Sequence, residues 1–109
     1  MDLAILIIWP SHNTPNFVNI IKKELVENQF TIINNKNITV SKRYVENILR
    51  EIHYGKKWWD INIIPESNKR INNDTNSQNI CYLNIKKNNI HLCCKQIKKY
   101  IRNKYKLDK

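Results

Sequence analysis

The stretch that decides the fold is SKRYVENILREIHYGKKWWD, residues 41–60. Its first part predicts an amphipathic helix, because apolar side chains recur there at helical spacing and form one stripe: Tyr44, Val45, Ile48, Leu49 and Ile52. Ser41 stands where an N-cap belongs, and Gly55, the only glycine of the chain, can adopt the left-handed conformation that ends a helix. Such a helix needs an apolar surface to cover, so strands are expected on both sides of it.

The residues before this helix predict a strand, a helix and a second strand. The apolar run LAILIIW, residues 3–9, is typical of a central strand that is buried on both faces. Pro15 suits the first position of a helix that runs to about Asn28, with Thr14 as its N-cap. The second strand starts at Phe30 and continues to Val40, with a turn or bulge at residues 34–37.

The residues after the helix predict one more strand and a last helix. Residues 61–64 fit either a short strand or a helical turn, residues 66–71 fit a helix, and residues 72–79 read as a surface loop. The third strand covers residues 80–85. The last helix begins at Ile90 or His91, with one face made of Cys93, Ile97, Tyr100, Ile101 and Tyr105.

This order, βαβα(α)βα, predicts an α+β fold in which helices pack on a sheet. The 109 residues suit a single domain, residues 1–109. Three strands leave a sheet edge exposed, and the last helix would normally be followed by a fourth strand. We therefore expect either a fragment of a longer protein or a sheet that a partner chain, or a second copy of this chain, completes at that edge.

The charge of the chain predicts an anionic partner. A net charge of +10 and a pI of about 9.7 attract nucleic acid, nucleotides or an anionic surface. The mixture of Asn, Ile and Lys is also what AT-rich coding DNA produces, so the excess of lysine has a second explanation. Residues 3–9 are too short to span a bilayer and no targeting signal precedes them, so no membrane association is expected.

The cysteines predict an intracellular, cytoplasmic protein. Their number is odd, two of them are adjacent, and their spacing fits neither a disulfide framework nor a metal site: Cys81, Cys93 and Cys94. We expect reduced thiols, with Cys93 packed as a small apolar side chain.

Three local patterns resemble nucleoside diphosphate kinases. Ile8-Trp9-Pro10-Ser11 takes the place of the Ile-Lys-Pro-Asp that ends the first strand of that family, and residues 30–41 resemble its second strand. HYGKKWW, residues 53–59, is similar to the family's His-x-x-Arg-Pro-Phe-Phe at matching spacing. The resemblance implies a ferredoxin-like antiparallel sheet. It also implies that Trp58 stacks on a nucleotide base and that His53 contacts phosphates.

The predicted ligand site therefore consists of His53, Lys56, Trp58 and Arg50, with an Mg-nucleotide as the cofactor that the resemblance allows. The chemistry of the family is missing, however. Its phosphate-binding Lys is Trp9 here, the Tyr of its helix is Arg50, and its catalytic His motif would follow the last helix, where this chain ends. We predict a nucleotide- or phosphate-binding domain that is not active as an enzyme alone, with no catalytic residue and no metal ligand.

Two alternatives come from other features. The last helix predicts a nucleic-acid-binding surface, because it is densely basic at Lys95, Lys98, Lys99, Arg102 and Lys106. The adjacent Trp58 and Trp59 can equally be a hydrophobic plug or a contact with a partner chain, which predicts a structural or assembly domain of a larger enzyme.

Overall fold

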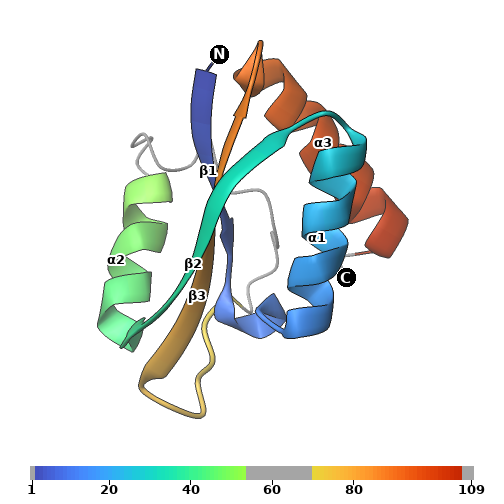
Figure 1. Ribbon diagram of the computed structural model, residues 1–109. Coiled ribbons are helices and arrows are strands. Elements are labelled where there is room, and N and C mark those ends of the chain that lie inside the picture. Colours follow the sequence, from blue (N-terminus) through green and yellow to red (C-terminus); the bar gives the residue numbers. More distant parts are fainter. Residues whose placement is uncertain (1, 54–69, 107–109) are drawn as a thin grey trace.

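The computed structural model describes residues 2–53 and 70–106. The elements are β1 (Asp2–Ile8), a short 3-10 turn η1 (Pro10–His12), α1 (Pro15–Glu27), β2 (Thr31–Ser41), α2 (Lys42–His53), β3 (Ser77–Lys87) and α3 (Ile90–Tyr105). The predicted α+β class is confirmed (Figure 1). Gly55, residues 61–64 and most of the predicted helix at 66–71 lie outside the described residues.

The described strands form one antiparallel sheet in the order β1-β3-β2. β1 and β2 both run antiparallel to β3, so they run parallel to each other on its two sides, and α1 connects them. The prediction that residues 3–9 form the central strand is therefore wrong, since β3 is central among the described strands. The run is apolar because helices cover both faces of β1: Leu6, Ile7, Ile8 and Trp9 have no exposed surface.

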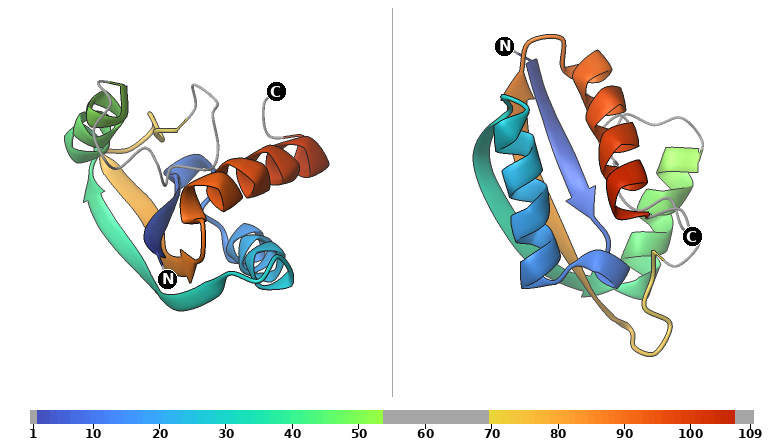
Figure 2. Two further views of the ribbon diagram at one scale, coloured as in Figure 1. Left: turned by 90° about the horizontal axis from the view of Figure 1, so that it is seen from above. Right: turned by 90° about the vertical axis from the view of Figure 1, so that its right-hand side faces the viewer.

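The helices divide between the two faces of the sheet (Figure 2). α1 and α3 lie side by side on one face, and α2 lies on the other. The larger core cluster joins the first pair to the sheet: Leu6, Ile8, Val18, Ile21, Leu25, Phe30, Cys81, Leu83, Ile85, Ile90, Cys94, Ile97 and Ile101. The smaller cluster lies beneath α2: Ile7, Trp9, Val45, Ile48 and Ile80. Because side chains alternate along a strand, β1 serves both cores.

Both predicted N-caps are confirmed. The Ser41 hydroxyl accepts a hydrogen bond from the Tyr44 amide at 3.1 Å, and the Thr14 hydroxyl accepts one from the Phe17 amide at 3.3 Å. Each satisfies a backbone N–H that has no partner within its helix. The two short polar side chains thus fix where α2 and α1 leave the preceding chain.

β2 continues without a break from Thr31 to Ser41, so the turn or bulge predicted at residues 34–37 is wrong: these four residues pair regularly with β3, and the irregularity lies just before them. The register against β3 shifts between Ile32 and Asn34. β3 also begins earlier than predicted, at Ser77. As a result β2 and β3 form a long ribbon that continues beyond the last β1–β3 pair, Ile8 with Cys81.

One residue of the predicted α3 core face is wrong, since Tyr100 is 47% exposed. Cys93 is half-buried and packs against the larger core, as predicted, while its neighbour Cys94 is the more deeply buried of the two. The buried side chains are Ile90, Cys94, Ile97 and Ile101, whose spacing of three or four residues keeps one line against the sheet. Tyr100 lies outside that line, and the Lys104 ammonium lies 5.4 Å from its ring centroid.

The exposed edge of β1 is shorter than the predicted open sheet edge. Leu6 to Trp9 are fully buried, which leaves only Asp2–Ile5 with accessible surface, and Leu3 is 69% exposed. A partner strand of any origin would therefore find at most four of the seven residues of this strand available for backbone pairing.

Candidate functional site

Among the described residues, the most distinctive charged feature is a row of cations along α3 and at the residue that follows it. Four of the five predicted cations recur at i, i+3, i+4 and i+7, so they line one side of the helix, and the fifth follows at the C-cap: Lys95, Lys98, Lys99, Arg102 and Lys106. We call these five residues the basic stripe. Lys95, Lys99 and Lys106 are exposed, while Lys98 and Arg102 are half-buried. The opposite flank of α3 packs on the sheet through Ile97 and its neighbours.

α3 itself contains no acidic residue. The sequence contains no Asp or Glu between Asp74 and Asp108, and hence none on α3. The i, i+4 pairs that offset charge on most surface helices cannot form here. From Lys95 to Lys106 the stripe extends roughly 16 Å at 1.5 Å per residue. The charges are therefore spread along a line, which suits a ligand with repeated negative charges better than one compact anion.

A buried carboxylate holds the end of α3 in place. Glu24 of α1 is 3% exposed and accepts hydrogen bonds from Lys104 Nζ at 2.6 Å and Tyr105 Oη at 2.8 Å. The bond from Lys104 lowers the pKa of Glu24, with burial opposing it and Tyr105 adding to it, and in return Glu24 raises the pKa of Lys104 and of Tyr105. This ion pair fixes the last turn of α3 against α1.

Sequence reasoning missed Glu24, although a signal was present. The apolar positions of α1 are Val18, Ile21 and Leu25, and Glu24 falls among them at i+3 from Ile21. A carboxylate on the apolar side of a helix is rarely buried without a partner. The basic helix near the C-terminus contains no acidic residue of its own, so it could have been expected to supply that partner.

The predicted nucleotide site is described only in part. Arg50 lies exposed on α2, where its Nη1 donates to Asn47 Oδ1 at 3.4 Å. His53 is the last residue of α2, but its side chain, Lys56 and Trp58 lie outside what the structure describes. Arg50 and the basic stripe belong to helices on opposite faces of the sheet (Figure 2), so they do not form one site.

The position of Trp9 also concerns the predicted nucleotide site. It occupies the place of the family's phosphate-binding Lys, and it is fully buried in the core beneath α2. This position therefore has a packing role, as the sequence predicted, and offers no cation to a phosphate.

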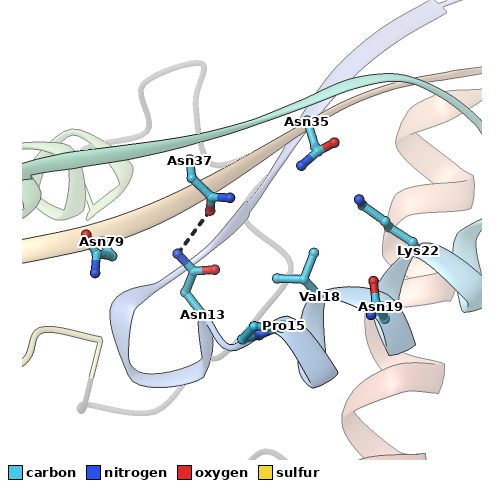
Figure 3. Close-up of a pocket in the computed structure, with 8 residues that line it drawn as sticks. All are labelled: Asn13, Pro15, Val18, Asn19, Lys22, Asn35, Asn37 and Asn79. Atoms are coloured by element: carbon cyan, nitrogen blue, oxygen red, sulfur yellow. Dashed lines mark hydrogen bonds between the residues drawn. The ribbon is translucent and has the colours of Figure 1, made fainter.

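A pocket of about 460 Å³ opens between α1 and the β2–β3 ribbon (Figure 3). Amide side chains dominate its lining, which consists of Asn13, Pro15, Val18, Asn19, Lys22, Asn35, Asn37 and Asn79. Asn13 Nδ2 donates to Asn37 Oδ1 at 3.4 Å, and Asn79 Oδ1 accepts from the Thr39 hydroxyl at 2.8 Å. Sequence reasoning missed this pocket, because strand register brings together asparagines that are up to 66 positions apart, from Asn13 to Asn79.

Neither a metal centre nor a membrane span is found in the described part of the chain. Residues 2–53 and 70–106 contain no group of three His, Cys, Asp or Glu that could bind a metal ion. None of the helices described is both long and apolar enough to cross a bilayer.

Comparisons with protein family models, with curated proteins and with solved structures find no match to this chain. The similarity to nucleoside diphosphate kinases therefore stays a prediction, and functional reasoning depends on the geometry above.

Proposed function

We propose that this chain binds nucleic acid through the basic stripe of α3, in a mode governed by charge and not by base sequence. One observation carries the proposal: four cations line one side of a helix that has no acidic residue, and a fifth, Lys106, follows at its C-cap. Lysine and arginine that replace the counterions of a phosphate backbone supply most of the affinity of non-specific binding. The spread of the charges over roughly 16 Å favours a polymer of phosphates over a single nucleotide.

The rigidity of the stripe supports the same function. α3 is anchored by four buried side chains and by the Glu24–Lys104 ion pair, so its cations are presented on a fixed support. A preorganised charge array loses less conformational entropy on binding than cations on a free segment.

The test is the affinity for a fluorescently labelled oligonucleotide, measured by anisotropy at 0.1 M salt. The variant replaces the three exposed cations of the stripe: Lys95→Gln, Lys99→Gln and Lys106→Gln. For single strands each phosphate contact contributes about 0.7 to the slope of log K against log salt, so losing three weakens binding at 0.1 M about a hundredfold.

A control variant removes the same charge elsewhere. Lys23→Gln, Lys36→Gln and Arg43→Gln lie exposed on α1, β2 and α2, and they lower the net charge equally. The proposal predicts a much smaller loss for this control. Equal losses for the two variants would mean that only the net charge matters, and the stripe would then have no particular role.

A second candidate is nucleotide binding at His53, Lys56 and Trp58. The arrangement of β1, α1 and β2 around β3 supports it, because this is the split β-α-β unit of ferredoxin-like folds, to which the nucleoside diphosphate kinase sheet belongs. Thermal unfolding with Mg-ATP and with tripolyphosphate at matched ionic strength tests it. A clearly larger midpoint shift with ATP is expected if the base is recognised. Equal shifts would leave only attraction to a basic surface.

A further inference from the structure

We propose that the pocket between α1 and the β2–β3 ribbon binds a phosphorylated sugar, either free or as part of a nucleotide. The pocket is separate from the basic stripe, since the lining residues that the structure describes include none of α3. It lies on the face of the sheet that α1 covers (Figure 3). Asn35 and Asn37 of β2 are paired with β3 residues that also pair with β1, and Asn79 of β3 lies just beyond the last β1–β3 pair.

The lining is chemically biased toward amides. Asparagine supplies five of the eight lining residues, against 18 of 109 in the whole chain. Each amide offers two N–H donors and a carbonyl acceptor. Asn19 and Asn35 make no side-chain hydrogen bond to any described residue, and the Asn13–Asn37 bond is long at 3.4 Å, so most of these groups are available to a ligand. Sugar hydroxyls are the matching chemistry, because each one both donates and accepts.

Lys22 gives the pocket its charge preference. Among the described lining residues it is the only ionisable side chain, and Figure 3 shows its ammonium group pointing from α1 toward Asn35 of β2. The described residues of the lining include no carboxylate that would repel an anion. A sugar that carries a phosphate can therefore place its hydroxyls among the amides and its phosphate at Lys22.

The size and the apolar part of the lining suit such a ligand. Val18 is buried and Pro15 lies beside it, which gives the carbon face of a sugar ring a surface to contact. The volume of about 460 Å³ lies within the usual range of small-molecule pockets, about 300–1,000 Å³.

Isothermal titration calorimetry with four probes tests this assignment: ribose 5-phosphate, AMP, ribose and inorganic phosphate. We expect both phosphorylated sugars to bind at least about tenfold more tightly than ribose or phosphate alone, as one charge-assisted contact added to the hydroxyl contacts allows. If the two phosphorylated sugars bind with equal affinity, the sugar phosphate alone is the ligand that the pocket recognises. If AMP binds more tightly than ribose 5-phosphate, the pocket recognises a nucleotide. Inorganic phosphate binding as well as ribose 5-phosphate, or no binding of any probe, would overturn the proposal.

Matched variants show whether binding occurs in this pocket. Lys22→Gln should weaken ribose 5-phosphate binding about tenfold, while its neighbour Lys23→Gln should not. Asn37→Asp places a negative charge in the pocket, whereas Asn34→Asp adds the same charge on the other face of β2. Equal effects within either pair would refute the assignment. The triple variant of the basic stripe should keep its affinity for ribose 5-phosphate, so the failure of one proposal does not imply the failure of the other.

Discussion

The replacement Trp9→Ala should cost about 4 kcal/mol of unfolding free energy. Trp9 has no exposed surface and belongs to the core beneath α2, with Ile7, Val45, Ile48 and Ile80. A buried tryptophan removes roughly 150–250 Å² from water, and at about 25 cal/mol per Å² this corresponds to about 4–6 kcal/mol. Alanine retains part of that burial, which agrees with the 3–5 kcal/mol that such truncations typically cost.

Urea unfolding followed by far-ultraviolet circular dichroism measures this loss. With a slope of roughly 1.5 kcal/mol per molar urea, the midpoint should fall by roughly 2–3 M. The free energy of unfolding of a domain of this size is about 5–15 kcal/mol, so the Trp9→Ala variant is expected to be only marginally stable. Trp9→Phe serves as a second, milder variant. Leu92→Ala, at a position that is 59% exposed, is the control and should change stability by less than about 0.5 kcal/mol. A loss below about 1 kcal/mol for Trp9→Ala would refute the packing role of this residue.

Three further predictions concern the structures that hold the helices and the ribbon. The pKa of Glu24 is lowered in the folded state, so its contribution is present above its unfolded pKa and is lost as the pH falls through the folded one. Urea midpoints of the wild type and Glu24→Gln should therefore differ at pH 7 and converge toward pH 3, whereas the exposed Glu27→Gln should follow the wild type; parallel curves for Glu24→Gln would contradict this. Ser41→Ala removes the N-cap of α2 and should cost about 1 kcal/mol by the same assay, while an unchanged midpoint would show that the cap is unimportant. Gln78→Leu should cost about 1–3 kcal/mol, because the buried Gln78 amide bonds the backbone of Asn72 and Thr75; hydrogen exchange in residues 72–76 should rise, and unchanged exchange there would exclude this role.

The sequence was sufficient for features that depend on local chemistry. Helical spacing predicted α1, α2 and α3 to within a few residues of the observed bounds, and the two caps followed from short hydroxyl side chains at Thr14 and Ser41. The burial of Trp9 followed from its place at the end of an apolar strand.

Features that depend on the arrangement of distant elements were not predictable in this way. A strand flanked by helices on both faces has the same apolar pattern at the edge of a sheet as at its centre, so β1 was misplaced. The position of Glu24 on the apolar side of α1 suggests burial with a partner, but only the packing of α3 against α1 identifies Lys104 as that partner. The asparagine pocket depends on strand register, and no local sequence pattern predicts that Asn37 and Asn79 line the same pocket as Asn13.

The measurement that tests the central proposal most directly is the salt dependence of oligonucleotide binding. If all five cations of the basic stripe contact phosphates, log K for single-stranded RNA should fall against log salt with a slope of about −3.5. Removing Lys95, Lys99 and Lys106 should reduce the magnitude of that slope by about 2, and the control variant on α1, β2 and α2 should leave it nearly unchanged. A slope that is the same for the wild type and the stripe variant would contradict nucleic-acid binding by α3.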